Sequence, residues 1–239
     1  MKQRVQKIIS SAGVCSRRNA EFLVNEGRIK INGETALLGD KADPNQDKIS
    51  LDGKYLCLKN KTKVILLNKP AGFITSCNDE FRRKTVLSLI PKDINQGLHP
   101  IGRLDKDSRG ALLLTNNGEL TLKLTHPRYC HSKTYKVWVK GKPSSDTINR
   151  WERGILLDEK KTIPAKVNLL ATHPKKSLLK VIIKEGRNRQ IRRIADELGH
   201  PVIDLQRIAI DEIKLNGLKE GEWRELINEE WEKYFNEKI

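Results

Sequence analysis

The sequence predicts an α+β fold, with a small N-terminal α/β domain over residues 1–60 and a larger domain over residues 61–239. Apolar runs of strand length are frequent and often not separated by full helices, which favours a largely antiparallel, mixed β-sheet with flanking helices. Hydrophobic residues make up 37% of the 239 residues, enough for packed cores and too many for a disordered chain. The polar stretch 60–63 separates two different hydrophobic patterns and is interpreted as a linker.

The first part of the chain is expected to begin with two short helices. Gly13 can end the first helix, and Ser16 is a good N-cap for a second helix over residues 17–26. Arg17 and Arg18 lie in the first turn of the second helix, where cations oppose the helix dipole. This placement indicates either a solvated pair of arginines or a phosphate site at the helix N-terminus. The residues that recur at helical spacing in the first helix are Val5, Ile8, Ile9 and Ala12.

Two hairpins complete the N-terminal domain. Residues 28–31 alternate in polarity, and the Asn32-Gly33 dipeptide that follows them favours a type I′ turn. Asp52-Gly53 predicts a second hairpin of the same kind. The polar segment 39–48 between the hairpins contains Pro44 and is expected to be a loop.

The larger domain is expected to contain buried strands, alternating strands and an amphipathic helix. Residues 64–67 and 111–115 are continuous apolar runs, which is typical of buried strands. The alternating run 133–140 places Tyr135, Val137 and Val139 on one face. Residues 178–183 predict a further strand, residues 85–90 a short helix, and residues 188–198 a helix with an apolar stripe at Ile191, Ile194, Ala195 and Leu198.

The charge of the chain indicates the kind of partner it binds. With 46 Lys and Arg against 30 Asp and Glu, the formal charge is +16, and such a surface repels itself in the compact state. Nucleic acid is therefore the first candidate. A membrane is disfavoured, because no apolar run approaches the length that spans a bilayer and no basic helix has a broad apolar face. Aromatic residues are only 5%, so phosphate contacts and shape should dominate binding.

Neither a metal nor a cofactor is expected. The four cysteines form no C-x-x-C spacing and are interpreted as reduced thiols, and the histidines form no H-E-x-x-H motif. The phosphate-binding motif G-x-x-x-x-G-K-[ST] is also missing. No secretory segment is visible at the N-terminus, so we expect a cytoplasmic protein, and we expect it to be a monomer.

Two basic segments are candidates for chemistry. In segment 102–110, Asp105 and Asp107 lie among three cations, which fits a salt-bridged surface turn or an ionised Asp in a basic pocket. A calcium loop is excluded, because its fifth position is an arginine and its twelfth is not glutamate. In segment 185–193, four arginines gather where a helix begins, and pairing of Arg192 with Asp196 would explain only one of them.

These segments resemble motifs of the pseudouridine synthases. Gly102-Arg103-Leu104-Asp105, followed by Ser108, Gly110 and Leu112-Leu113, is similar to the family's catalytic-Asp motif. Residues 4–33 are similar to the small RNA-binding domain of ribosomal small-subunit protein four. This combination points to the bacterial branch that modifies ribosomal RNA, namely synthase A for the small ribosomal subunit, and synthases B, E and F for the large one. The chain departs from the usual pattern at Ala111, Cys130, His131 and Asp211. Further matches, in the expected order, are Asn68-Lys69-Pro70-x-Gly72, Lys133-Thr134-Tyr135, Glu185 to Arg193, Gly199-His200-x-Val202, Leu205-x-Arg207 and Leu215-x-x-Leu218-x-x-Gly221.

The resemblance implies a cofactor-free isomerisation of uridine to pseudouridine in ribosomal RNA or a pre-ribosomal particle, more readily of the large subunit, with the target taken out of the stack. It implies that Asp105 is the nucleophile, attacking either the uracil ring or the anomeric carbon. Tyr135 would stack on the base and take a proton, and without the resemblance a lone tyrosine on such a strand is usually core. Arg192 would pair with Asp105, and Leu205 would pack beneath the base. The expected RNA contacts are Arg17, Arg18, Arg28, Lys30, Arg103, Arg187, Arg189 and Arg193.

Two other functions are compatible with the charge of the chain. A non-catalytic RNA-binding or ribosome-assembly factor would share the basic surface and the first domain, but it would not need the set of Asp105, Tyr135 and Arg192. A metal-dependent RNA hydrolase would need several convergent carboxylates, and near Asp105 the sequence offers only Asp107.

Overall fold

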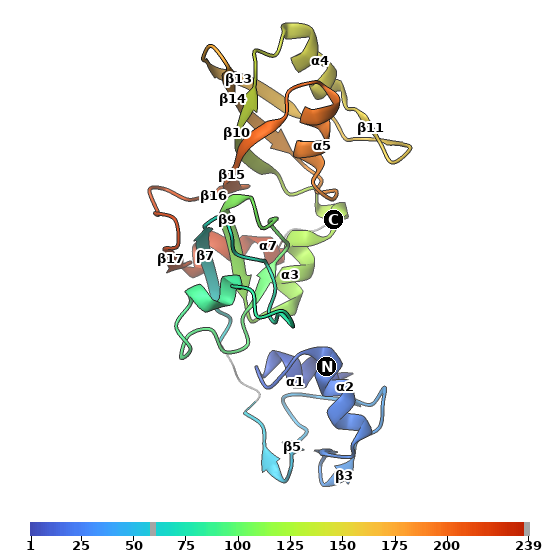
Figure 1. Cartoon of the computed structure of the whole chain (residues 1–239). Coiled ribbons are helices and arrows are strands. Elements are labelled where there is room, and N and C mark those ends of the chain that lie inside the picture. The colour runs from blue at the N-terminus through green and yellow to red at the C-terminus, as the bar shows by residue number, and fades with distance from the viewer. Residues whose placement is uncertain (58–60, 237–239) are drawn as a thin grey trace.

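The computed structural model describes residues 1–57 and 61–236, arranged as a small N-terminal unit and a larger body (Figure 1). The small unit pairs two helices with a four-stranded antiparallel sheet in the order β3-β2-β5-β6. Its apolar residues form a cluster of their own. Its elements are α1 (Val5–Ser11), α2 (Arg17–Asn25), β2 (Ile29–Ile31), β3 (Glu34–Thr35), β5 (Ile49–Leu51) and β6 (Lys54–Tyr55).

The local sequence determines this unit as expected. The Ser16 side chain caps α2 by accepting a hydrogen bond from the Asn19 backbone N–H at 3.2 Å. Asn32 and Gly33 both have positive φ, as a type I′ turn requires. The segment 39–48 is not entirely loop, because β4 (Lys41–Ala42) pairs with β1 (Gln3–Arg4) in a short two-stranded sheet. The expected linker 60–63 and the domain boundary at residue 60 lie partly outside the described residues, since the description resumes at residue 61.

The larger body is built on one nine-stranded sheet, which confirms the α+β fold class. The strand order is β13-β14-β10-β15-β9-β7-β17, with β16 paired to β15 and β8 paired to β9. Every pair is antiparallel except β15 with β9. The strands are β7 (Val64–Lys69), β8 (His99–Ile101), β9 (Arg109–Thr115), β10 (Lys133–Lys140), β13 (Lys166–Thr172), β14 (Lys176–Ile183), β15 (Val202–Ile210), β16 (Ile213–Lys214) and β17 (Trp223–Glu225).

Helices cover the sheet unevenly. On one face a continuous apolar core runs across both halves of the sheet, beneath α4, α5 and the 3₁₀ helix η1. On the opposite face, α3, α6 and α7 cover β7, β9 and the neighbouring β8, β16 and end of β15, and no residue of β10, β13 or β14 belongs to this second cluster. Figure 1 shows α4 and α5 on the same side of β10, β13 and β14. The helices are η1 (Val86–Leu89), α3 (Gly118–Thr125), η2 (Pro127–Tyr129), α4 (Ser145–Arg153), α5 (Gln190–Glu197), α6 (Asn228–Trp231) and α7 (Lys233–Asn236), and a hairpin of β11 (Leu156–Leu157) and β12 (Lys160–Lys161) extends beside α5.

One predicted helix begins later than expected. Residues 188 and 189 lie before α5 rather than within it, because Arg189 has a left-handed backbone conformation, with φ of 46°. The expected short helix over 85–90 is the 3₁₀ helix η1. None of the described helices is long and apolar enough to cross a membrane.

The two halves of the sheet meet where β9 runs parallel to β15. Arg207 is paired with Gly110, and Gln206 with Arg109. Gly110 has φ of +110°, and a Cβ built on it would lie 2.1 Å from the carbonyl oxygen of Arg207. Glycine is therefore required for the two strands to approach this closely. The Arg207 side chain reinforces the junction, since its Nε donates to the Ala111 carbonyl oxygen at 2.7 Å.

Candidate active site

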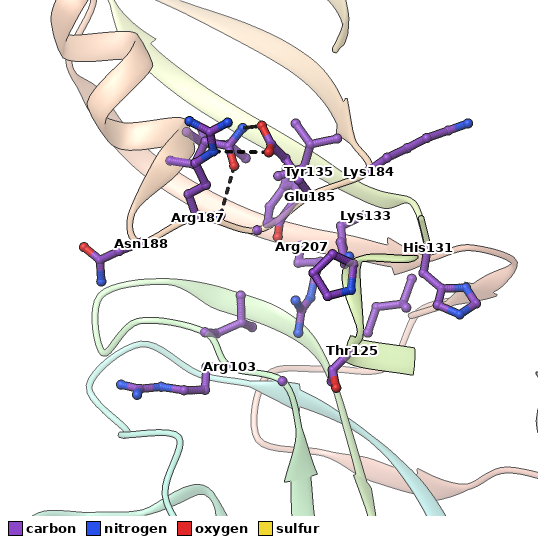
Figure 2. A pocket seen from close by; sticks show the side chains of 18 of the residues that line it. Arg103, Thr125, His131, Lys133, Tyr135, Lys184, Glu185, Arg187, Asn188 and Arg207 are labelled. Carbon is purple, nitrogen blue, oxygen red and sulfur yellow. Dashed lines mark hydrogen bonds and ion pairs between the residues drawn. The ribbon is translucent and has the colours of Figure 1, made fainter. Parts of the chain in front are cut away.

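A cavity of about 590 Å³ opens beside this junction, between the two halves of the sheet. Its lining includes Asp105, Tyr135 and Leu205, so the structure brings together three of the four predicted catalytic residues. Figure 2 shows Tyr135, Lys133 and Arg207 close together, with Arg103 and Arg187 on opposite sides of the cavity. Arg103, Arg187 and Arg189 also line it, whereas Arg192 and Arg193 do not.

The loop that carries Asp105 is held by the segment that follows β7. The Thr75 hydroxyl donates to the Leu104 carbonyl oxygen at 2.7 Å, and the Gly72 backbone N–H donates to that of Lys106 at 2.8 Å. The buried Lys69 ammonium donates to the carbonyl oxygens of Lys106 and Ser108, at 3.3 and 2.7 Å. These contacts fix the backbone on both sides of Asp105.

Lys69 is a fully buried cation of the Asn68-Lys69-Pro70 motif, and the sequence pattern alone does not indicate its role. Its third N–H donor reaches the Pro70 carbonyl oxygen at 3.0 Å, so all three donors of the ammonium have partners. Burial lowers the pKa of Lys69 to about 8, against the attraction of Asp105 and Asp107. Lys69 is thus a positioning residue for the Asp105 loop, and it neutralises part of the loop's negative charge.

The expected ion pair of Asp105 with Arg192 is not formed in the structure. Arg189 pairs with Asp105 instead, with 3.6 Å between its Nη1 and Asp105 Oδ2. Arg192 donates from Nη2 to the Asp107 carbonyl oxygen at 3.1 Å and to the Ser108 hydroxyl at 3.2 Å. Arg189, in a left-handed backbone conformation, is the last residue before α5 and pairs with Asp105. Arg192 lies in the first turn of α5 and reaches the residues that follow Asp105 in the loop. Both arginines therefore contact this loop, and the one that pairs with Asp105 is Arg189 rather than Arg192.

Tyr135 and Leu205 come from neighbouring strands of the half-sheet that faces Asp105. Tyr135 of β10 is paired with Arg207 of β15, and Leu205 is paired with Val137. Tyr135 and Leu205 are 8% and 6% exposed, so both present a buried wall to the cavity rather than a solvated surface. The alternation that placed Tyr135 on the core face with Val137 is thus confirmed.

Two further cations line the cavity and were not singled out individually in the sequence. Arg207 is buried, and its Nη2 has no hydrogen-bond partner among the described residues. Lys133 lies beside it, and burial together with the Arg207 charge lowers the pKa of Lys133. The motif Leu205-x-Arg207 contained this signal, but a spacing alone does not show that the arginine turns inward.

Two of the departures from the family pattern are partners in the structure. His131 Nδ1 lies 2.7 Å from the Asp211 carboxylate, and Asp211 also accepts from the backbone N–H and hydroxyl of Ser132. Burial would raise the pKa of Asp211, but the hydrogen bonds from His131 and Ser132 outweigh it and lower the pKa. Asp211 has φ of 46°, in the left-handed region that favours glycine. The departures at Asp211 and His131 therefore occur together, because the two side chains bind each other.

Two of the arginines expected to contact RNA have partners within the protein. Arg187 donates to the carbonyl oxygens of Leu157, Lys160 and Lys161, at 3.2, 2.7 and 2.7 Å, and also pairs with Glu185. Arg193 forms two hydrogen bonds with the Asp158 carboxylate, at 2.8 and 2.6 Å. Both arginines therefore attach the β11–β12 hairpin to the body. Arg187, between β14 and α5, binds carbonyl oxygens of the hairpin, and Arg193 of α5 binds its aspartate.

The cations expected to bind RNA in the N-terminal unit differ in their surroundings. Arg28 pairs with Asp52 and Glu26, and these contacts raise its pKa. Arg17 lies next to the larger body, since a Cβ on Gly118 at the start of α3 would meet its Nη2 at 3.2 Å. In the described part of the chain, the exposed Arg17, Arg18 and Lys30 of this unit make no ion pair, and neither does Arg103 of the larger body.

No metal site accompanies these groups in the described part of the chain, where no three His, Cys, Asp or Glu side chains come together to hold an ion. The cavity instead combines a carboxylate on a clamped loop, a tyrosine, an aliphatic floor and several cations. Such a site can hold a polyanion and present a nucleophile to a planar ring.

Comparison with known proteins identifies the class. Residues 63–197 match the family of RNA pseudouridylate synthases, and residues 3–47 match the S4 domain. The chain therefore belongs to the RNA pseudouridine synthase family, and it is an isomerase with an S4 domain before its catalytic domain.

Individual relatives extend over nearly the whole chain. The chain is 45% identical to the ribosomal large subunit pseudouridine synthase B of Bacillus subtilis, covering 94% of this chain and 92% of the relative. It is 32% identical to the dual-specificity RNA pseudouridine synthase RluF of Escherichia coli, covering 95% and 76%. A crystal structure of a pseudouridylate synthase superposes with a TM-score of 0.70 at 31% identity, covering 97% of this chain and 99% of that one.

Proposed function

We propose that this enzyme converts a specific uridine of ribosomal RNA to pseudouridine without a cofactor. We assign the uridine to the RNA of the large subunit rather than the small one. The observation that carries the proposal is the meeting of Asp105, Tyr135 and Leu205 in one cavity walled by cations. The large-subunit enzyme of Bacillus subtilis, 45% identical to this chain, supports the choice of RNA. The proposed enzyme acts as a cytoplasmic monomer on ribosomal RNA or on a pre-ribosomal particle.

In this reaction the bond between N1 of uracil and C1′ of ribose breaks, the base turns, and C5 bonds to C1′ before losing its proton. Asp105 acts as the nucleophile, either on C1′ or on the ring, and its carboxylate leaves again when the new bond is complete. Tyr135 stacks on the base, and its phenolic oxygen takes the C5 proton as its own proton passes to solvent, while N1, freed from the ribose, takes up a proton in turn. Leu205 packs beneath the base, and the surrounding cations hold the phosphates of the flipped nucleotide.

The test is conversion of uridine by Asp105→Asn, assayed on unmodified RNA of both subunits with EDTA present. The amide keeps the shape of the side chain but removes the nucleophile, so we expect conversion below about 1% of wild type and RNA affinity within a few-fold of it. Asp107→Asn is the matched control, because Asp107 lies in the same loop, is exposed, and does not line the cavity. Wild-type activity in Asp105→Asn, or loss of it in Asp107→Asn, would contradict the assignment.

A further inference from the structure

The outer face of strands β10, β13 and β14 is not covered by any helix of the described chain. Val137 and Val139 point to the core beneath α4 and α5, so the residues between them point to the opposite side. In the other half of the sheet, that same side is buried by α3, α6 and α7. The partly buried Trp138, Leu178 and Ile182 lie on this outer face and belong to no core cluster.

Lysines face one another across this surface. Lys136 is paired directly with Lys180, and Lys140 directly with Lys176, on the antiparallel strands β10 and β14. Like charges placed directly opposite each other destabilise a sheet. Lys166 of β13 adds a fifth ammonium on the same side, because it is paired with Ile182. A surface that violates a pairing rule without a visible compensation indicates a function.

No carboxylate balances these lysines in the structure. Across the described residues, none of the five makes an ion pair. Asp204 of β15 is paired with Trp138 and so brings an acid to this face. Its carboxylate is already bound by Arg109, at 2.9 and 2.7 Å. The surface therefore keeps a concentrated positive charge that only an external anion can neutralise.

Trp138 lies at the centre of the lysine pairs. The Lys176 ammonium is 4.5 Å from the centroid of its ring, and the His173 ring is 5.4 Å away. A cation held over an aromatic ring has a defined position rather than a free one. Lys136 and Lys140, on either side of Trp138, are about 13 Å apart along the strand. The charges are thus spread along a flat surface instead of gathered at one point.

We propose that this face is a second RNA-binding surface, which holds the sugar–phosphate backbone of ribosomal RNA outside the segment that contains the target uridine. The proposal rests on the proposed function for the identity of the RNA. The face and the cavity lie on opposite sides of the sheet, since Tyr135 lines the cavity and the alternate residues Lys136 and Trp138 face outward. A bound segment on the outer face is therefore a flanking one, and a short substrate does not reach it.

The test compares two triple variants that remove the same charge. One replaces Lys136, Lys140 and Lys180 by glutamine, and its control replaces the exposed Lys92, Lys214 and Lys219 in the same way. Affinity is measured at several salt concentrations for full-length large-subunit RNA and for a short fragment that the wild type converts. Each phosphate contact contributes about 0.7–0.9 to the salt slope, so the first triple should lower the slope by about 2–3 on long RNA.

The other readouts make the proposal specific. On the short fragment both triples should match the wild type in affinity, and conversion at saturating RNA should be unchanged. The urea midpoint of the first triple should equal or exceed that of the wild type, because the substitutions remove repulsion between lysines.

If the two triple variants showed equal salt slopes of affinity on long RNA, the proposal would be overturned, since the effect would then come from net charge alone. A loss on the short fragment would overturn the placement outside the target segment. An unchanged slope on RNA, with weaker binding to protein-containing particles, would assign the face to an acidic protein instead. Failure of the wild type to convert any RNA would refute the proposed function, while the slopes on long RNA would still test this surface.

Discussion

Replacing Gly110 by alanine should separate the two halves of the sheet. The new Cβ would lie 2.1 Å from the Arg207 carbonyl oxygen and 2.7 Å from the Arg207 nitrogen, so β9 and β15 must move apart by about 1 Å to reach an allowed contact. A φ of +110° adds about 1–3 kcal/mol of backbone strain for alanine. A displacement of about 1 Å in a catalytic site can cost about 10²-fold in rate. Asp105 and Tyr135 stand on opposite sides of this junction, so their alignment is what the displacement changes.

The assay is single-turnover formation of pseudouridine on a converted RNA fragment, together with urea unfolding of the same preparation. We expect a rate loss of about 10²-fold and a destabilisation of about 2–4 kcal/mol. Gly217→Ala is the matched control, because Gly217 also has positive φ, at +83°, but a Cβ there meets nothing within 4 Å. It should cost about 1–2 kcal/mol and leave the rate unchanged. A Gly110→Ala enzyme with wild-type rate would refute the view that the junction aligns the site.

Three further substitutions test individual side chains, and a fourth tests a buried charge. Tyr135→Phe keeps the ring and removes the hydroxyl, so RNA affinity should stay constant while the single-turnover rate falls about 10²–10⁴-fold, and a rate near wild type would leave the tyrosine as packing only. Arg189→Gln removes a half-exposed ion pair with Asp105 and should lower the rate about two- to fivefold without changing the urea midpoint. Arg192→Gln should instead destabilise the fold by about 1–2 kcal/mol, and the reverse pattern would restore Arg192 as the partner of Asp105. Lys69→Met tests the lowered pKa of Lys69, which is about 8 against a usual 10.5. Between these two pH values the unfolded chain binds more protons than the folded one, so the wild type gains stability as the pH rises. The unfolding free energy of the wild type minus that of the variant should therefore rise by about 2 kcal/mol from about pH 7.5 to about pH 9.5. A difference that stays constant or falls over this range would contradict the lowered pKa.

Local patterns predicted the elements that local physics determines. The Asn32-Gly33 and Asp52-Gly53 turns follow from the need for positive φ, and all four residues have it. The face of Tyr135 follows from alternation along one strand. The cap at Ser16 follows from the unpaired N–H groups of a helix start. None of these depends on a distant part of the chain.

The partners of the long cations could not be predicted in this way. Arg189 and Arg192 are three residues apart, and each is long enough to reach the Asp105 loop. The choice between them depends on a left-handed residue at the start of α5 that the sequence pattern does not reveal. The engagement of Arg187 with three carbonyl oxygens likewise depends on a hairpin nearly 30 residues earlier, as the Leu157 contact spans 30 positions. Strand β15 was not predicted. Its parallel pairing with β9 joins residues far apart in the sequence, such as Arg207 and Gly110, and no local pattern indicates such a pairing.

The position of β15 in the sheet has a consequence for how the protein is made. This strand begins at Val202, yet it lies between β10 and β9, and the two groups of earlier strands share no ladder without it. Until β15 has been synthesised, the two groups of strands can form only as separate sheets, each with an open edge. Insertion of β15 closes both edges at once and brings Leu205 opposite the Asp105 loop. The nascent enzyme accordingly gains its active site in a single late step, after the N-terminal unit is already able to fold.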